Sequence, residues 1–379
     1  MGKKYSKSYP ISNTLRLLYP FFIKKINQLS HSGRYINMET EISQLGEFGL
    51  IERLTKDFPL SNPESRVGVG DDAAILDFGD NEVLVTTDLL LEGIHFDVRY
   101  VPLKHLGYKA AIVNFSDIYA MNGTPKQITV SLGVSSRFTV ENIEAIYSGI
   151  RLACELYGVD LVGGDTSASV TGLVISITCI GVAEKGKAIR RNGAKPTDVI
   201  CVSGDLGAAF MGLQLLEREN TIAACQQNFQ PDFAGKEYIL ERQLKPEARK
   251  DIVHLLKENG ITPTSMIDVS DGLSSELLHI CKASNVGCRV YEDKIPIDYQ
   301  TALMAEEFNM NLVTAAMNGG EDYELLFTVP LAEHEKVEKL KGVNMIGYVT
   351  SPDLGAALVT RDGSEIPIKA QGWNAFADK

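Results

Sequence analysis

The chain has 379 residues, of which 44% are hydrophobic, and a formal net charge of −12 at pH 7. This length is enough for two ordinary domains with buried cores, and the acidic balance argues against nucleic acid as a partner. No apolar run is long enough to span a bilayer, so we expect no membrane partner.

The six cysteines form no C-x-x-C pair, and most of them lie inside apolar segments. Reduced cysteines in such positions are typical of a cytoplasmic protein. We therefore expect a cytoplasmic localisation, without structural disulfides and without a thiolate zinc site.

Residues 1–37 differ from the rest of the chain, because they carry seven Lys or Arg residues and no acid. Part of this segment resembles a short signal-peptide core, but Arg16 and Pro20 interrupt it and no small-residue cleavage site follows. We interpret residues 1–37 as a disordered extension or as the product of an upstream start, with Met38 as the true beginning.

Beyond a short amphipathic helix predicted over residues 43–57, helical and strand patterns are interleaved along the chain. In the first half the sequence predicts strands at 82–86, 127–134, 159–162 and 173–182, and helices at 102–121 and 139–157. In the second half it predicts strands at 198–202, 266–268, 288–291, 322–329 and 345–349, helices at 208–216, 250–259, 273–283 and 335–340, and a hairpin over 357–368. Residues 220–236 are polar, and we expect an irregular surface excursion there.

Both halves mix strands and helices, and Gly-Asp turns recur at comparable places in each. The sequence therefore predicts an α/β fold with mixed sheets, in which two related units share a cleft. We place the first domain at residues 42–186 and the second at residues 187–379.

The most distinctive pattern is a set of acids that each end an apolar run at a turn. They lie in Gly70-Asp71-Asp72, Thr86-Thr87-Asp88, Ser116-Asp117, Gly163-Gly164-Asp165-Thr166, Asp268-Val269-Ser270-Asp271-Gly272 and Gly319-Gly320-Glu321-Asp322. The adjacent Asp71 and Asp72 repel each other unless a cation lies between them. Carboxylates at strand ends and helix starts are the ligands that Mg²⁺ prefers, so the sequence predicts a site in which several metal ions bind phosphate.

Three standard motifs explain this pattern less well. A Walker A loop is absent, and Asp268-x-x-Asp271 lacks the alternate spacing of an EF-hand. Gly68-x-Gly70-x-x-Ala73 matches a dinucleotide fingerprint, with Asp88 at the distance of a ribose-binding acid. Two aspartates would face the pyrophosphate there, and the next turn leaves no room for a crossover helix.

The ordered motifs resemble those of thiamine-monophosphate kinases. The resemblance rests on the acid motifs above, together with Asn114-Phe115-Ser116-Asp117-Ile118, Arg191-x-Gly193-Ala194 and Gly319-Gly320-Glu321-Asp322-Tyr323-Glu324-Leu325. It runs from about Leu45 to the C-terminus, with one departure at Asn122-Gly123. It implies a two-domain fold like that of aminoimidazole ribonucleotide synthetase, with the N-terminal sheet forming a homodimer interface. The implied reaction is ATP-dependent phosphorylation of thiamine monophosphate to thiamine diphosphate, with several Mg²⁺ ions.

The resemblance also implies roles for single residues. The implied metal ligands are Asp71, Thr86, Thr87, Asp88, Asp117, Asp165, Asp268 and Asp271, of which Asp117 and Asp271 are also the implied catalytic residues. The implied ATP contacts are Tyr147, Gly164, Asp165, Arg191 and Ser270. The implied contacts to the thiamine substrate are His95, Glu321 and Trp373.

The residues support the same chemistry independently of the resemblance. When the acceptor is itself a phosphate, two polyanions must approach to bonding distance, and a pocket with many aspartates collects the cations that allow this. Catalysis then consists of positioning and charge neutralisation, without a nucleophilic side chain.

Other members of the same superfamily, and one other class of protein, remain as alternatives. A selenophosphate synthetase would need a reactive cysteine before Gly70, whereas the first cysteine is Cys154, and a hydrogenase-maturation relative would end in a cysteine. A ligase that forms aminoimidazole ribonucleotide fits residues 319–325 poorly. A non-catalytic protein that binds Mg-nucleotide would not need so many acids.

Overall fold

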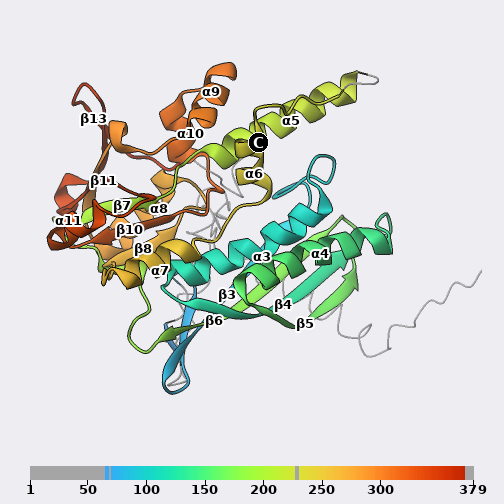
Figure 1. Ribbon diagram of the computed structural model, residues 1–379, viewed down its shortest axis with the longest axis horizontal. Coiled ribbons are helices and arrows are strands. Elements are labelled where there is room, and N and C mark those ends of the chain that lie inside the picture. Colours follow the sequence, from blue (N-terminus) through green and yellow to red (C-terminus); the bar gives the residue numbers. More distant parts are fainter. Residues whose placement is uncertain (1–64, 68–69, 227–229, 372–379) are drawn as a thin grey trace, which may run out of the picture.

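The computed structural model describes residues 65–67, 70–226 and 230–371. The extension at residues 1–37, the helix predicted over residues 43–57 and Trp373 all lie outside these residues. Two mixed β-sheets with helices packed against them make up the described chain, which is drawn in Figure 1.

The first sheet has six strands in the order β1-β2-β3-β6-β4-β5. The strands are β1 (Ser65–Val67), β2 (Ala74–Asp77), β3 (Asn81–Leu91), β4 (Thr124–Val134), β5 (Asp160–Ala168) and β6 (Val174–Glu184). Neighbouring strands run antiparallel except for β4 and β5, which run parallel. The edge strand β5 is exposed at every position.

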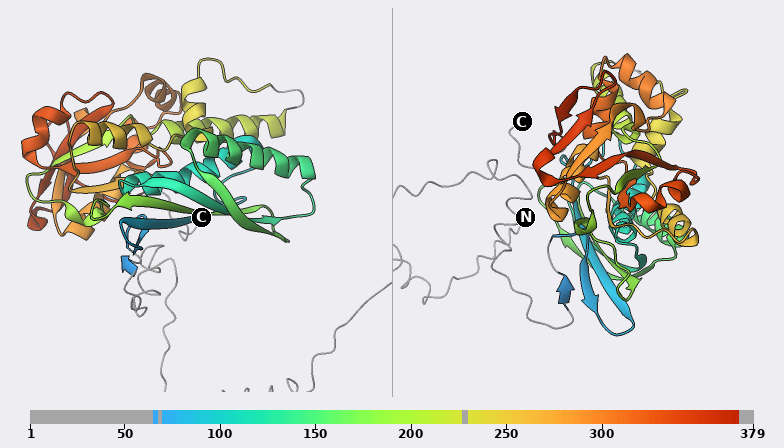
Figure 2. Two further views of the ribbon diagram at one scale, coloured as in Figure 1. Left: turned by 60° about the horizontal axis from the view of Figure 1, so that its bottom comes forward. Right: turned by 90° about the vertical axis from the view of Figure 1, so that its left-hand side faces the viewer.

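Two long helices, α3 (Leu103–Ala120) and α4 (Val140–Tyr157), lie together over one face of this sheet (Figures 1 and 2). Along β6, buried residues such as Ile175 and Ile177 alternate with partly exposed ones. This alternation is expected for a sheet that is covered on one side, because successive side chains of a strand point to opposite faces. Below, the face under α3 and α4 is called the inner face, and the opposite one the outer face.

The second sheet has seven strands in the order β13-β12-β9-β11-β7-β10-β8. The strands are β7 (Val199–Ser203), β8 (Ser265–Asp268), β9 (Gly287–Tyr291), β10 (Leu325–Val329), β11 (Val343–Thr350), β12 (Ala356–Val359) and β13 (Glu365–Pro367). The accompanying α-helices are α5 (Ala208–Cys225), α6 (Glu237–Leu244), α7 (Lys250–Glu258), α8 (Leu273–Ser284), α9 (Tyr299–Glu307), α10 (Leu312–Asn318) and α11 (His334–Val337). A 3₁₀ turn, η2 (Arg191–Gly193), precedes β7.

One hydrophobic core continues from the first half of the chain into the second. The same cluster of buried side chains contains Ile177 of β6, Ile112 of α3, Ile252 of α7 and Phe327 of β10. The α3 helix therefore packs against both halves, and this places its polar residues at their junction. The domain boundary between residues 186 and 187 stays a prediction.

Most predicted elements occur close to their expected positions, and the differences have local causes. Helix α5 continues to Cys225, nine residues beyond the predicted end, so the irregular segment predicted over residues 220–236 begins only after it, and residues 223–225 are exposed. The strand predicted to end at residue 162 instead runs on to Ala168. The predicted strand at 322–329 starts only at Leu325, since residues 320–323 form a tight turn.

Candidate functional site

Three aspartates from distant parts of the sequence converge beside α3. One carboxylate oxygen from each of Asp72, Asp117 and Asp268 lies within 4.8 Å of the others. Asp72 precedes β2, Asp117 is in the last turn of α3, and Asp268 is the last residue of β8. We call these three residues the carboxylate cluster. It joins both halves of the chain, and two of its members, Asp117 and Asp268, belong to the predicted ligand set, whose role in metal binding stays a prediction.

Hydroxyl groups orient two of these carboxylates. The Thr86 hydroxyl donates to Asp117 Oδ2 at 2.5 Å, and the Ser116 hydroxyl donates to Asp268 Oδ2 at 2.6 Å. Each aspartate keeps a second oxygen for another ligand, an arrangement that is typical of supported metal ligands.

Asp88 lies beside the cluster with an unsatisfied oxygen. Thr86 and Asp88 share the inner face of β3, because they are two residues apart on one strand. Asp88 Oδ2 is buried and has no hydrogen-bond partner among the described residues. A buried carboxylate oxygen without a partner is unfavourable, and a cation would satisfy it.

Burial and mutual repulsion shift the acids of this site toward their protonated forms. Burial, with the nearby charges of Asp88 and Asp268, raises the pKa of Asp117 well above its usual value. Burial and the neighbouring Asp72 raise the pKa of Asp268 to about 8, and burial raises the pKa of Asp88 to about 6. Without metal the site therefore retains protons that a divalent cation would displace.

Two adjacent arginines contact the Asp71-Asp72 pair. Arg191 binds Asp72 with two hydrogen bonds of 2.9 and 2.7 Å. Arg190 Nε donates to Asp71 Oδ2 at 2.9 Å, and the backbone N–H of Arg191 donates to Asp71 Oδ1 at 2.9 Å. The predicted ligand Asp71 is thus held by arginine and backbone, whereas its neighbour Asp72, absent from the predicted ligands, lies in the cluster.

Ser270 and Asp271 lie in a loop that is attached to the loop 319–324 by backbone hydrogen bonds. The Glu321 N–H donates to Ser270 O at 2.7 Å, and the Tyr323 N–H donates to Val269 O at 2.9 Å. The Asp271 N–H donates to Glu276 Oε1 at 3.0 Å. Because Glu321 itself makes one of these hydrogen bonds, the predicted acceptor residue Glu321 lies next to the predicted residues Ser270 and Asp271.

Thr87 and Asp165, by contrast, lie on the outer face of the first sheet. Thr87 alternates with Thr86 and Asp88, so its side chain leaves the opposite side of β3. Paired residues of neighbouring strands form a row across the sheet. This row runs from Asp165 of β5 through Ser131 of β4 and Ser176 of β6 to Leu89 of β3. Three strand spacings of about 4.8 Å put Asp165 about 14 Å from β3. A single chain therefore does not bring Asp165 to the carboxylate cluster.

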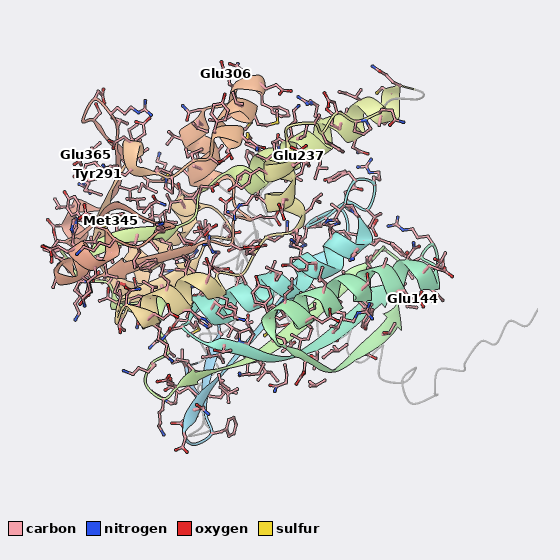
Figure 3. All side chains as sticks on the ribbon, viewed as in Figure 1. Glu144, Glu237, Tyr291, Glu306, Met345 and Glu365 are labelled. Atoms are coloured by element: carbon pink, nitrogen blue, oxygen red, sulfur yellow. The ribbon has the colours of Figure 1, made fainter. Side chains whose placement is uncertain are left out.

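Tyr147 and Gly164 line a separate hollow next to Asp165. This cavity of about 520 Å³ is bounded by Tyr147, Leu161, Gly163, Gly164, Asp165 and Thr166. A neighbouring cavity of about 990 Å³ continues along α4, where Glu144, labelled in Figure 3, is one of its lining residues. Gly164 has φ +156°, and a Cβ there would lie 1.9 Å from Val130 O, so only glycine fits this strand.

The remaining predicted substrate residues are dispersed. Glu321 contacts Lys109 of α3, whose Nζ lies 2.9 Å from its Oε1. His95 is exposed, and its Nδ1 accepts the backbone N–H of Leu91 at 3.0 Å. Trp373 lies outside the described residues. Sequence reasoning missed Asp72, Ser116 and Lys109 as site residues, although the first two stand inside motifs that it singled out.

No helix within residues 65–67, 70–226 and 230–371 is both long enough and apolar enough to cross a membrane.

Known proteins resemble the chain in sequence and in fold. The family described as AIR synthase related protein, N-terminal domain, matches residues 70–183. Thiamine-monophosphate kinase of Bacillus subtilis (strain 168) is 35% identical over 339 residues, which cover 88% of this chain and 100% of the relative. That of Aquifex aeolicus (strain VF5) is 34% identical over 320 residues, which cover 82% of this chain and 97% of the relative.

A solved structure of AaThiL complexed with AMPPCP and TMP superposes with a TM-score of 0.75 at 32% identity. The superposition covers 89% of this chain and 99% of the AaThiL chain. Because these likenesses extend far beyond residues 70–183, they include both sheets, and they confirm the predicted fold class.

Proposed function

The chain belongs to the thiamine-monophosphate kinase family, and we propose that it transfers the terminal phosphoryl group of ATP to thiamine monophosphate. The observation that carries this proposal is the carboxylate cluster at the junction of the two halves. Its buried acids exceed the cations that the chain supplies to them, as expected for a site that binds metal-complexed phosphates.

The donor set fits Mg²⁺. It consists of carboxylates and a hydroxyl, which are hard oxygen ligands, and it includes the buried Asp88 oxygen that lacks a partner among the described residues. We propose that Asp72, Thr86, Asp88, Asp117 and Asp268 hold Mg²⁺ on the inner side, with Asp71 and Asp271 next to them. Bound Mg²⁺ supplies the positive charge that lets two polyanionic phosphates approach each other.

The residues of the chain position the reactants. A phosphate acceptor is largely ionised near neutral pH, so no side chain need act as a base. Two unit charges about 4 Å apart repel by about 4 kcal/mol at an effective dielectric constant near 20, which makes charge neutralisation the main task of the site. Asp117 and Asp271 are the proposed catalytic residues, as the resemblance to the family implies.

We propose that ATP lies between the arginine pair and the cavity next to α4. Arg191 has a planar, bidentate group suited to phosphate oxygens, and Ser270 adds a hydroxyl from the second half. Tyr147 and Gly164 line the cavity that would receive the other end of the nucleotide. Glu321, His95 and Trp373 are the proposed contacts of the thiamine substrate.

The working form that we propose is a homodimer. Among the described residues, helices cover only the inner face of the first sheet, while Leu89 on the outer face is 52% exposed. A second copy packed on this face would cover it, and it would also surround Thr87 and Asp165. This arrangement explains why two proposed metal ligands face away from the cluster of their own chain.

We also propose that the enzyme works in the cytoplasm. All six cysteines are free thiols, and five of them are buried. Such cysteines fit a reducing compartment.

The direct test is to incubate the protein with ATP, thiamine monophosphate and Mg²⁺ and to measure thiamine diphosphate. We expect turnover that a chelator abolishes and that added Mg²⁺ restores. If a folded sample forms no product at any Mg²⁺ concentration, the proposal is wrong. Light scattering at micromolar concentration tests the homodimer separately, and a monomer alone would contradict it.

A further inference from the structure

One face of α3 makes two polar contacts with the second half of the chain. Lys109 and Ser116 are seven residues apart, nearly two helical turns, so they point in the same direction. Ser116 donates to Asp268 of the carboxylate cluster. Lys109, which lies nearly two turns before Ser116 and is only 7% exposed, contacts Glu321.

The backbone around Glu321 is held in a rare conformation. Glu321 and Tyr323 both have positive φ, +59° and +53°, in the left-handed region that non-glycine residues seldom occupy. Strain of this kind persists only where the surroundings fix it, and it concentrates at functional sites. The hydrogen bond from the Glu321 N–H to Ser270 O is one such restraint.

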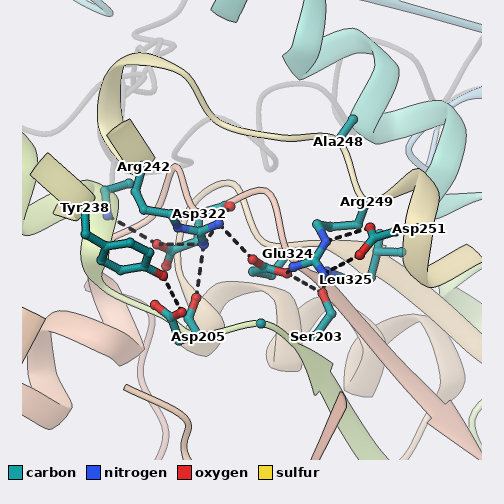
Figure 4. A network of polar contacts seen from close by, with 12 residues as sticks. Ser203, Asp205, Tyr238, Arg242, Ala248, Arg249, Asp251, Asp322, Glu324 and Leu325 are labelled. Carbon is teal, nitrogen blue, oxygen red and sulfur yellow. Dashed lines mark hydrogen bonds and ion pairs between the residues drawn. The ribbon is translucent and has the colours of Figure 1, made fainter. Parts of the chain in front are cut away.

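A buried ion network fixes the residues that follow Glu321, as Figure 4 shows. Glu324 pairs with Arg249 at 2.5 Å and with Arg242 at 2.9 Å, and it also accepts the Ser203 hydroxyl. Asp322 accepts the backbone N–H of Gly207 at 2.8 Å. We call the contacts of Glu324 with Arg242 and Arg249 the Glu324 network. It anchors the main chain of the loop but does not touch the Glu321 carboxylate.

The Glu321 carboxylate is held by two other residues. Lys109 Nζ lies 2.9 Å from Oε1, and Gln243 Nε2 donates to Oε2 at 3.0 Å. Lys109 Nζ also donates to the backbone carbonyl of Gln243 at 3.0 Å. That carbonyl lies in the last turn of α6, where carbonyl groups lack helical partners and attract a cation. The Lys109 ammonium group is therefore held by the Glu321 carboxylate and by the C-terminal end of α6.

We infer that Lys109 is a positioning residue for the acceptor substrate, acting with Gln243 to orient the Glu321 carboxylate. A carboxylate offers about four acceptor positions, and Lys109 and Gln243 occupy one on each oxygen. The Glu321 side chain is 31% exposed, so its other positions are open to a ligand that brings a positive charge or N–H donors. This inference rests on the proposed function, in which Glu321 contacts thiamine monophosphate.

Lys109→Met tests the inference, because methionine fills the space of the stem without the charge. We expect the KM for thiamine monophosphate to rise about tenfold, while the KM for ATP changes less than twofold. Calorimetric titration with thiamine monophosphate alone should show the same tenfold loss without any turnover. Gln243→Leu removes the hydrogen bond to the other oxygen of Glu321. This variant should weaken the affinity for thiamine monophosphate by a smaller factor.

Lys104→Met is the matched control, since Lys104 is an exposed lysine on the same helix. It should leave both KM values and the melting temperature unchanged. The decisive variant is Lys109→Met combined with Glu321→Gln. If Lys109 acts through Glu321, the pair should bind thiamine monophosphate no more weakly than Glu321→Gln alone.

Three outcomes would overturn the inference in an active wild-type enzyme. These are an unchanged affinity in Lys109→Met, a parallel rise of both KM values with a lower melting temperature, and fully additive effects in the double variant. The last would mean that Lys109 touches the substrate itself. Failure of the proposed function is distinguishable, because the wild-type protein would then neither form thiamine diphosphate nor bind thiamine monophosphate.

Discussion

The structure contains two groups of buried acids that the chain treats differently. In the Glu324 network, one carboxylate faces two arginines, so the chain itself neutralises the charge that it buries. In the carboxylate cluster, three aspartates face one another, and Arg191 on Asp72 is the one arginine paired with them in the described part of the chain. The first arrangement stabilises the fold, whereas the second leaves negative charge for a cation from outside.

The pKa values of the cluster aspartates agree with this contrast. Burial and neighbouring aspartates raise the pKa of both Asp117 and Asp268, which indicates that the native structure disfavours their charged forms. Removing one negative charge should therefore affect stability in opposite directions in the carboxylate cluster and in the Glu324 network. In the cluster it relieves repulsion, and in the Glu324 network it leaves arginines unpaired.

Asp117→Asn should produce the largest change in activity. Because it removes a ligand from the centre of the cluster, we expect kcat/KM to fall about 1,000-fold, or ~4 kcal/mol. The metal-free melting temperature should stay equal or rise, since one repelling acid is gone and asparagine still accepts from Thr86. A melting temperature several degrees lower would mean that Asp117 stabilises the fold, as Glu324 does.

Glu324→Gln should produce the largest change in stability. Arg242 and Arg249 would remain buried without their carboxylate, so the free energy of unfolding should fall by about 3 kcal/mol in a urea titration. The control is Glu184→Gln, which removes an exposed glutamate paired with Lys257 and should have no measurable effect. Equal stability of the Glu324 variant and wild type would remove the contrast between the two groups of acids.

Arg191→Met should have a smaller effect, because Arg191 contacts the carboxylate cluster only through Asp72. Asp72 would lose its arginine, and ATP would lose the phosphate contact proposed for Arg191, so we expect the KM for ATP to rise about tenfold, or ~1.4 kcal/mol. Arg190→Met is the matched comparison, because its side chain is 39% exposed and pairs with Asp71 outside the cluster. An equal loss of ATP affinity in both variants would mean that Arg191 contributes no more to ATP binding than Arg190 does.

The sequence predicted the order of most elements, and it singled out the acid motifs that contain the residues of the carboxylate cluster. Local patterns carried this information, as in α4, where Thr139 and Asn142 form a capping box and Gly158 ends the helix in a left-handed conformation. Asp117 and Asp268 of the cluster could be named because each stands at the end of an apolar run.

Three features depended on contacts between distant residues and were missed. Asp72 rather than Asp71 joins the cluster, because the turn before β2 directs adjacent side chains to different partners. Gly163-Gly164 was expected to end a strand, yet β5 continues because Gly164 packs closely on Val130. Lys109 gave no local signal, since its partners Gln243 and Glu321 lie more than 130 residues away.

The stabilisation of the protein by Mg²⁺, measured as a function of pH, shows whether the carboxylate cluster holds its acids for a divalent cation. The pKa values of Asp88 and Asp268 are raised to about 6 and about 8, above the value near 3.9 of an unfolded aspartate. Such groups stabilise the protein fully below pH 4, and this contribution is lost as the pH rises through the folded pKa values.

Mg²⁺ competes with these protons, so its binding strengthens as they leave. We therefore predict that the increase in melting temperature caused by Mg²⁺ grows from pH 5 to pH 8. Asp322, whose burial raises its pKa to about 7, lies outside the cluster and contributes equally with and without Mg²⁺. If Mg²⁺ does not raise the melting temperature, or raises it equally at every pH, the carboxylate cluster does not hold its acids for a divalent cation.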